Sequence, residues 1–336
     1  MAVASTSDSE VSGRPVASLD ELYQAFDDLS IEGGWHQRSP ALWDQPRKSL
    51  LPHGWKYSDV KPILAAAGDL VDQDMSDRRN VTLTNPAEGN TFPTVRTLVA
   101  AYQLIRPGEA AKAHRHTPSA LRIILEGHGT YTVVQGERVE MRPGDVVLTP
   151  SWLWHEHAQM STSSGDCYWV DILDVPLVHL LETMFFERLP GDFQGEVEDL
   201  DEAPIVFRWE DSVARLEIAT APAHGMSEQE IELGAPALRT IALHMQQMSA
   251  GFVSATSRTT SNSVFTVLEG RGRTEADGTT IEWSRGDVVA IPAWRPYRHV
   301  VSENARLVRA SDEPLMAALG LLRTETLQAS HRSRRE

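Results

Sequence analysis

The stretch GDVVLTPSW at residues 144–152 recurs, with six of its nine residues identical, as GDVVAIPAW at residues 286–294. A second block, ILEG at residues 124–127, recurs as VLEG at residues 267–270, and the two blocks are separated by nearly the same distance in both copies. Two blocks that repeat at matched spacing rarely arise by chance, so the repeat predicts two homologous domains. The chain of 336 residues is long enough to hold both.

Short runs of strand-forming residues surround these blocks. The run TYTVVQGERVEM at residues 130–141 indicates two strands joined by a Gln-Gly turn, and VVL at residues 146–148 indicates another strand. Many short strands between Gly and Pro turns are typical of a sandwich or a barrel. The sequence therefore predicts an all-β fold of two similar β-domains.

Helical patterns are few and lie at the edges of the repeats. A capping-box pattern at residues 18–21 predicts a first helix, and residues 59–67 predict a second. Residues 176–187, with proline at the start, and residues 312–323, with acidic residues in the first turn, predict two more. We expect a disordered arm at 1–17, a helical and extended segment at 18–95, a catalytic metal-binding domain at 96–187, a linker at 188–234, a second domain without metal ligands at 235–323 and a tail at 324–336.

Composition excludes several classes of partner. The chain has 31 Lys and Arg against 47 Asp and Glu, a net charge of −16, which disfavours binding to nucleic acid or to an anionic membrane. It has no apolar run of the ~20 residues that a membrane span needs. The single cysteine, Cys167, forms no disulfide within the chain, and we expect a cytoplasmic protein. An anionic substrate would need a local basic pocket.

Histidines are concentrated in the first repeat. His114 and His116 are two residues apart, so on a strand both would project from one face. His155 follows the repeated GDVV turn and could reach the same point. Three neutral imidazoles leave coordination positions open on a metal, as a catalytic site requires. We therefore predict a metal site formed by these three residues.

The second repeat provides an internal control for this prediction. Aligning the blocks places Ser257, Thr259 and Tyr297 opposite the three histidines. The fold therefore does not require histidine at these positions, and we expect one metal per chain, in the first repeat. His299 matches His157, but without a ligand set beside it we interpret His299 as structural.

With these motifs the chain resembles the cupin superfamily. The matching residues are Gly108, His114, His116 and Gly127 of the first cupin motif, and Gly144, Pro150 and His155 of the second. The glutamate usual in the first motif is missing, since Ala120-Leu121 occupy its place, and Trp152 stands where glycine is usual. The missing glutamate implies a three-histidine site instead of the commoner four-ligand site.

More narrowly, from about Leu19 to Arg323, the chain resembles the gentisate and salicylate 1,2-dioxygenase family of bicupins. The resemblance is carried by PHGWK at 52–56, RR at 78–79, NP at 85–86, PGE at 107–109, HRHTPSALR at 114–122 and WVD at 169–171. It implies two double-stranded β-helix barrels with a few peripheral helices, Fe(II) in the first barrel, and a homotetramer. It also implies that O2 opens a salicylate-type ortho-hydroxybenzoate between the carboxyl- and hydroxyl-bearing carbons.

A basic pocket for the substrate carboxylate can be assigned in part. Arg122 lies six residues after His116 and shares its inward parity, so it could pair bidentately with a carboxylate. The family pattern points to Arg78, with Arg79 as the adjacent alternative, although isolated arginines are commonly surface charges. It also points to Gln103, which could instead be an ordinary polar strand residue.

Three further residues complete the predicted site. His157 shares the parity of His155, and we expect it to bond a substrate oxygen or to carry the phenolic proton; a fourth metal ligand or a packing residue is the alternative. Asp171 could orient Arg122 or His157, or only cap a loop. The family often has tryptophan where Val99 stands, and the smaller side chain could enlarge the pocket.

The exact reaction remains open at this point. The substrate could be gentisate, a salicylate with a 5-substituent such as nitro or halo, or 1-hydroxy-2-naphthoate. A different cupin enzyme, such as an isomerase or a quercetinase, would usually keep the glutamate ligand that is missing here. A cupin that only binds a small ligand would tolerate loss of the histidines.

Overall fold

A computed structural model describes residues 16–35, 41–73, 75–234 and 237–327. Most of the expected arm and the end of the expected tail lie outside these residues. The chain divides into two units, Met1–Arg47 and Lys48–Glu336. The second unit contains both repeats, and the candidate site belongs to it.

The first unit contains helix α1 (Leu19–Asp28). The Ser18 hydroxyl accepts a hydrogen bond from the Glu21 amide, and the Glu21 carboxylate accepts one from the Ala17 amide. The sequence therefore predicted the start of this helix correctly. Among the described helices, none has the length and apolar character needed to cross a membrane.

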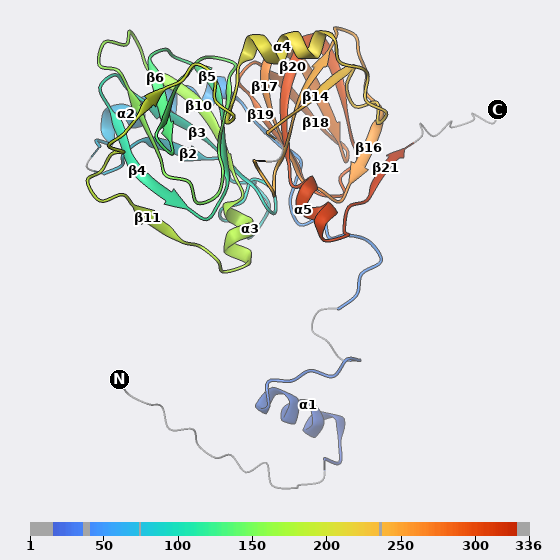
Figure 1. Cartoon of the computed structure of the whole chain (residues 1–336). Coiled ribbons are helices and arrows are strands. Elements are labelled where there is room, and N and C mark those ends of the chain that lie inside the picture. Colours follow the sequence, from blue (N-terminus) through green and yellow to red (C-terminus); the bar gives the residue numbers. More distant parts are fainter. Residues whose placement is uncertain (1–15, 36–40, 74, 235–236, 328–336) are drawn as a thin grey trace, which may run out of the picture. The chain divides into compact units, whose positions relative to one another are not determined.

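The first repeat forms a barrel of two six-stranded sheets (Figure 1). Its strands are β2 (Arg79–Thr82), β3 (Val99–Ile105), β4 (Ala110–His116), β5 (Ala120–Glu126), β6 (Thr130–Val134), β7 (Glu137–Met141), β8 (Val146–Thr149), β9 (His155–Gln159), β10 (Cys167–Leu173), β11 (Phe186–Arg188), β12 (Glu198–Asp199) and β13 (Val206–Phe207). The strand orders are β13-β8-β5-β10-β3-β2 and β11-β4-β9-β6-β7-β12. The predicted strands at 130–141 and 146–148 are confirmed.

The second repeat forms one nine-stranded sheet. Its strands are β1 (His53–Trp55), β14 (Gln229–Leu233), β15 (Ala242–Met248), β16 (Thr256–Thr259), β17 (Ser263–Ala276), β18 (Thr279–Ser284), β19 (Val288–Ile291), β20 (Tyr297–Ser311) and β21 (Thr324–Leu327). β17 and β20 each cover the length of two strands of the first repeat, and their pairing shifts register between Val267 and Gly272. The continuous strands join what are two separate sheets in the first barrel.

The segment that precedes each barrel packs against the other barrel. β1 precedes the first barrel but pairs with β19 of the second, whereas β13 precedes the second barrel but pairs with β8 of the first. Helices α2 (Tyr57–Leu70) and α4 (Trp209–Glu217) contact the other barrel at their N-termini, whereas α2 packs along β2 and β3 of the first barrel and α4 along β14 and β15 of the second. The Tyr57 amide donates to Asp287 over 2.8 Å, and the Trp209 amide donates to Asp145 over 2.9 Å. The aspartates of the repeated GDVV blocks therefore cap the helix N-termini.

The glycine of each GDVV block is explained by the same contact. Gly144 and Gly286 have φ angles of +91° and +89°, which favour glycine. A Cβ at Gly144 would lie 2.8 Å from the Trp209 ring, and one at Gly286 would lie 2.5 Å from the Tyr57 ring. Each glycine allows the turn to bend and the incoming helix to approach closely.

Two reciprocal hydrogen bonds join the barrels further. The Thr97 hydroxyl donates to Asp312 over 2.5 Å, and the Thr240 hydroxyl donates to Asp174 over 2.5 Å. All four side chains are mostly buried, and residues of both barrels contribute to one hydrophobic core cluster. The two barrels therefore share a core instead of meeting through a solvated interface.

Three predicted helices differ from the structure in length. α2 is longer than the predicted 59–67, whereas α3 (Val175–Leu180) and α5 (Glu313–Ala318) are much shorter than 176–187 and 312–323. After each short helix a residue of positive φ turns the chain, Glu182 in one case and Gly320 in the other. The chain then adds a strand to its own barrel, β11 beside β4 and β21 beside β16. Pairing with a strand at the edge of the sheet therefore determines the conformation of these segments, although the spacing of their apolar residues predicted a longer helix.

Candidate metal centre

The three predicted histidines lie together inside the first barrel. His114 and His116 come from β4 and His155 from β9, which pairs with β4 so that His114 and His155 face each other. The ring centroids of His114 and His155 are 4.4 Å apart, and those of His116 and His155 are 4.8 Å apart. One ring nitrogen from each histidine lies within 4.8 Å of the other two. These side chains form the group able to hold a metal that is found among the described residues.

Backbone hydrogen bonds fix which nitrogen each ring presents. The Nδ1 atoms of His114, His116 and His155 lie 2.8, 2.8 and 3.0 Å from the carbonyl oxygens of Lys112, Pro118 and Leu153. A carbonyl can only accept, so Nδ1 carries the proton and Nε2 keeps its lone pair. The Nε2 atom of His155 is buried without a hydrogen-bond partner. Three convergent lone pairs fit a metal ion.

Burial keeps these imidazoles in their neutral form. Burial and the nearby Arg78 charge lower the pKa of His114 to about 4. Burial also lowers the pKa of His116, and it lowers the pKa of His155 well below the ordinary value. Neutral imidazole is the form that ligates a metal.

A buried cationic pocket adjoins the histidines. Arg122 on β5 is 1% exposed and lies 3.5 Å from Asp171 on β10. Gln103 on β3 donates its amide to Asp171, while its carbonyl accepts a bond from Arg78 Nε over 2.5 Å. Burial lowers the pKa of Arg122 to about 10, so this guanidinium stays protonated near pH 7, and burial also lowers the pKa of Arg78. Three arginines (Arg78, Arg122 and Arg188) lie near two carboxylates (Asp77 and Asp171), so the pocket carries an excess positive charge.

The side chains of the adjacent Arg78 and Arg79 have different partners. Arg79 is buried, but it binds Glu109 through two bonds of 2.5 and 2.6 Å, so its charge is already paired. Arg78 lines the cavity and donates a hydrogen bond to the Gln103 carbonyl oxygen. The geometry therefore favours Arg78 over Arg79. Val99 is buried on β3 with the same inward parity as Gln103.

His157 is fully buried in β9, and its ring centroid lies 5.7 Å from that of His155. It does not belong to the three-histidine group, and neither of its ring nitrogens has a hydrogen-bond partner among the described residues. Burial and the Arg122 charge lower its pKa well below the ordinary value. A neutral imidazole with both nitrogens free can accept a proton from a bound group or bond to it.

The second barrel lacks such a centre in its described residues. Ser257 and Tyr297 pair with each other where His114 and His155 pair in the first barrel. Tyr297 and Phe265 fill the interior around His299, whose Nδ1 lies 2.9 Å from the Thr274 hydroxyl. His299 therefore takes part in core hydrogen bonding.

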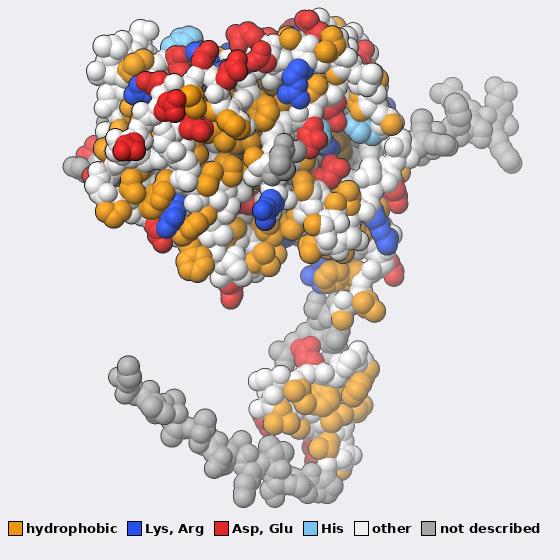
Figure 2. All heavy atoms as spheres, in the orientation of Figure 1, with side chains coloured by type: hydrophobic (Ala, Val, Ile, Leu, Met, Phe, Trp, Pro, Cys, Tyr) orange, Lys and Arg blue, Asp and Glu red, His pale blue; other side chains and the backbone are white. Residues whose placement is uncertain are grey.

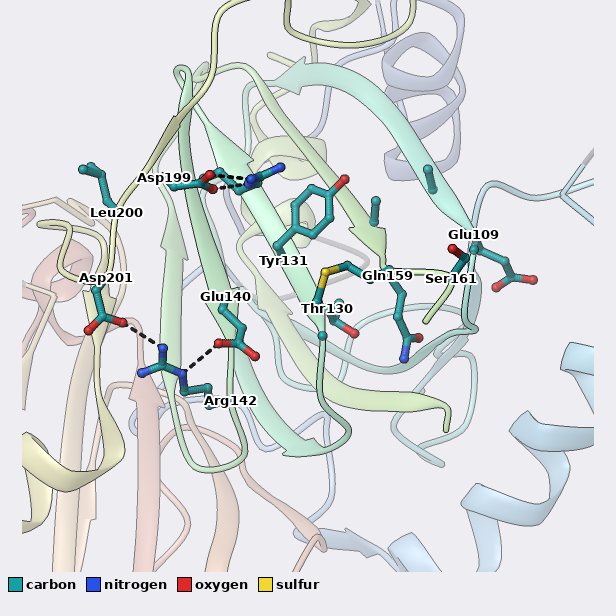
Figure 3. A pocket seen from close by; sticks show the side chains of 16 residues that line it. Glu109, Thr130, Tyr131, Glu140, Arg142, Gln159, Ser161, Asp199, Leu200 and Asp201 are labelled. Atoms are coloured by element: carbon teal, nitrogen blue, oxygen red, sulfur yellow. Dashed lines mark hydrogen bonds and ion pairs between the residues drawn. The ribbon is translucent and has the colours of Figure 1, made fainter. Parts of the chain in front are cut away.

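A cavity of about 320 Å³ lies beside the histidines and is lined by Arg78, Asn80, His114, Phe186 and Arg188 among others. The Phe186 ring stacks on that of His114 with centroids 5.4 Å apart. A larger cavity of about 820 Å³ lies on the outer face of the β6–β7 side of the barrel. Figure 3 shows Arg142 between Glu140 and Asp201 there, and no histidine is among the residues that line this cavity. We assign the site to the smaller cavity because His114 of the three-histidine group and Arg78 line it.

Some residues of the site were missed in the sequence. Trp169 Nε1 donates to Asp171 over 2.8 Å, and the Thr149 hydroxyl accepts a bond from Arg122 over 2.5 Å. Phe186 was placed in a predicted helix, but it lies on β11 beside His116. Trp169 could have been found by its two-residue spacing from Asp171. Thr149 could not, because its contact depends on how β5 and β8 pair.

Fold and site together define a bicupin with a three-histidine cluster in its first barrel. Residues 101–173 match the family described as the cupin domain. The chain is 32% identical to a 5-aminosalicylate 1,2-dioxygenase of Comamonas sp., over 93% of this chain and 91% of the relative, and 31% identical to gentisate 1,2-dioxygenase 1 of Aquipseudomonas alcaligenes, over 90% and 95%. The solved structure of a salicylate 1,2-dioxygenase from Pseudaminobacter salicylatoxidans superimposes with a TM-score of 0.83 at 28% identity, covering 94% of this chain and 99% of the other. The chain belongs to the gentisate and salicylate 1,2-dioxygenase family of ring-cleaving bicupins.

Proposed function

We propose that this protein is an Fe(II)-dependent dioxygenase that uses O2 to open an ortho-hydroxybenzoate between its carboxyl- and hydroxyl-bearing carbons. The observation that carries the proposal is the excess of positive charge, from the buried Arg122 and the half-buried Arg78, next to three convergent imidazoles. A buried cationic pocket in a protein of net charge −16 calls for an anionic ligand. Gentisate and salicylates with a 5-substituent such as amino, nitro or halo are the proposed substrates.

Each residue has a proposed role. His114, His116 and His155 hold the metal, and Fe(II) bound there would supply open positions where an aromatic acid and O2 can meet. Arg122 receives the substrate carboxylate, because a guanidinium fork matches a carboxylate. His157 accepts the phenolic proton at a ring nitrogen.

The remaining residues set the surroundings of the substrate. Arg78 adds a second positive charge, which Gln103 orients through its carbonyl oxygen. Asp171 fixes the Gln103 amide and balances part of the charge of Arg122. Val99 forms part of the buried wall, whereas Arg79 acts only as the alternative to Arg78 because Glu109 already pairs it.

We also propose residues 96–187 as the catalytic cupin, residues 235–323 as the second cupin, and a cytoplasmic homotetramer. Exposed apolar side chains support self-association: Leu180, Phe185 and Phe186, on and beside α3 and β11, are more than half exposed. In Figure 2 hydrophobic side chains are visible over this part of the first barrel, whereas acidic side chains gather along the opposite edge. Light scattering of the purified protein tests the mass of the assembly.

The function is tested by anaerobic loading with Fe(II), followed by oxygen uptake with gentisate, salicylate, 5-substituted salicylates and 1-hydroxy-2-naphthoate. We expect one iron per chain and turnover of one-ring substrates. His114→Ala and His155→Ala should each lose iron and turnover, while His299→Ala, which removes the matched buried histidine of the second barrel, should keep one iron. Turnover by the His114→Ala variant, or iron lost on changing His299 alone, would contradict the assignment. Selective turnover of 1-hydroxy-2-naphthoate would move the protein to the two-ring alternative.

A further inference from the structure

Both oxygens of the buried Asp171 carboxylate are occupied by neutral donors. Trp169 Nε1 donates to Oδ1 over 2.8 Å, and the Gln103 amide donates to Oδ2. The three side chains are 0%, 4% and 2% exposed for Trp169, Gln103 and Asp171, so water does not compete for these bonds. The carboxylate is therefore held in one orientation.

This orientation keeps the nearby arginine from forming a closed pair. Arg122 Nε lies 3.5 Å from Asp171 Oδ1 and makes no hydrogen bond, although it is buried. Arg122 is fixed by its NH1 group, which donates to the Thr149 hydroxyl over 2.5 Å. Arginine and carboxylate side chains in contact often form two parallel hydrogen bonds. Here that arrangement is absent, and the guanidinium is anchored by a neutral hydroxyl.

The second barrel shows that the fold does not need this arrangement. Strand register places Phe265 opposite Arg309, as Arg122 is opposite Asp171 in the first barrel. By the same pairings, Ile291 takes the place of Thr149 and Leu307 the place of Trp169. The hydroxyl and the indole N–H are thus found in the barrel that carries the histidine cluster, and apolar side chains replace them in the other.

We propose that Trp169 and Thr149 are positioning residues that keep Arg122 available to the substrate carboxylate. Trp169 holds Asp171 so that it does not close on Arg122, and Thr149 fixes the guanidinium at one end. The bound carboxylate then meets donors that are not already paired. This inference rests on the proposed function.

Removing either residue has a defined consequence. In Trp169→Phe, Asp171 Oδ1 loses its neutral donor and turns to Arg122, so the protein's own carboxylate competes with that of the substrate. In Thr149→Val, a side chain of the same shape lacks the acceptor, and Arg122 loses its anchor. Both changes weaken the binding of the anion without touching the histidines.

Binding of salicylate to the iron-loaded protein without O2, measured by titration calorimetry, tests the inference apart from turnover. Trp169→Phe and Thr149→Val should each bind about 10-fold more weakly, the loss expected for one hydrogen bond to a charged group. KM should rise by the same factor while kcat changes much less. Thr149→Ser restores the hydroxyl and should recover the affinity. Trp283→Phe removes another buried indole hydrogen bond, 3.0 Å long and donated to the Thr274 hydroxyl of the second barrel, and should leave affinity unchanged.

The possible results separate the two proposals. If the wild-type protein neither binds salicylate-type anions nor consumes oxygen with them, the proposed function fails. If the wild type does both but Trp169→Phe and Thr149→Val bind as tightly as it does, the positioning role is wrong. A loss of kcat at constant KM, or equal losses in Thr149→Ser and Thr149→Val, would also overturn that role.

Discussion

We propose that the side chain of Val99 helps to set the size of the substrate pocket. It is 4% exposed and lies on the inward face of β3, four residues from Gln103. Replacing it by tryptophan would add a ring to this wall, and added volume in a packed site excludes larger ligands first. In Val99→Trp we expect KM for 5-nitrosalicylate to rise about 10-fold more than KM for gentisate. Steady-state kinetics on both substrates check this, and an equal rise for both would show that Val99 does not sense the 5-substituent.

Glu230 gives a pH-dependent contribution to stability. Burial alone would raise its pKa, but hydrogen bonds from His224 and Gln246 and the charge of Arg309 lower it to about 2. Because the folded pKa lies below that of the unfolded chain, this stability is complete above pH ~4.5 and is lost as the pH falls toward 2. Urea unfolding should show that the stability difference between wild type and Glu230→Gln shrinks by about 3 kcal/mol over this range.

A control for Glu230 is available in the same barrel. Glu303 pairs with Arg271 at the surface, where both side chains are more than 60% exposed. Glu303→Gln should change stability by less than about 1 kcal/mol at any of these pH values. A pH-independent difference between wild type and Glu230→Gln would contradict the prediction.

Single residues of the site were predictable to different degrees. The histidine cluster follows from a two-residue spacing and a repeated turn, because strand parity places side chains on one face. The hydrogen bonds of Thr149 and Trp169 depend on strand register, which the sequence does not encode locally. Trp152 departs from the glycine usual in its motif, yet its φ of +67°, like the +60° of Trp294 in the second repeat, lies in the region that favours glycine.

At the scale of secondary-structure elements, the two aspartates of the GDVV blocks, Asp145 and Asp287, both cap a helix but differ in how far their cationic partners are buried. Asp145 also pairs with Arg208, with the two side chains 1% and 8% exposed, whereas Asp287 pairs with Lys56, which is 39% exposed. Asparagine keeps an acceptor for the helix amide but removes the charge. We expect Asp145→Asn to cost about 3 kcal/mol, because it leaves a buried cation, and Asp287→Asn about 1 kcal/mol. Urea unfolding of the two matched variants measures both, and equal costs would refute the argument.

The sequence predicted which helices and strands exist better than it predicted where they end. The repeat identified two β-domains, and Ser18 correctly marked the start of α1. The helices predicted at 176–187 and 312–323 were too long, because β11 and β21 instead complete the sheet edges. The segment expected as linker contains β13, which pairs with the first barrel, and α4, which packs on β14 and β15 and bonds to the first barrel through its first amide. The spacing of apolar residues within a segment gives no information about its pairing with a strand about 70 residues away in the sequence.

At the scale of the whole second unit, the exchanged segments make the barrels depend on each other. β1 and the N-terminus of α2 are held by contacts with the second barrel. α2 is followed in the chain by Arg78 and β2, which belong to the first barrel and its site. β13 and the start of α4 need the first barrel. We therefore expect a single unfolding transition that is the same when it is monitored by circular dichroism and by tryptophan fluorescence. Two separated transitions would mean that the barrels fold independently.

The same dependence predicts what happens when the chain is cut between the barrels. Gly195 lies in an exposed segment, and a side chain there would meet no atom within 4 Å, so a protease site should be tolerated. After cleavage, the two fragments should remain together and keep one iron, because the shared core and the Thr97–Asp312 and Thr240–Asp174 bonds survive. The first fragment expressed alone should bind no iron, since β1 loses its partner strand, the N-terminus of α2 loses Asp287, and β8 loses β13. Size-exclusion chromatography with metal analysis distinguishes these results. A first fragment that folds and binds iron alone would show that the second barrel is dispensable for the site.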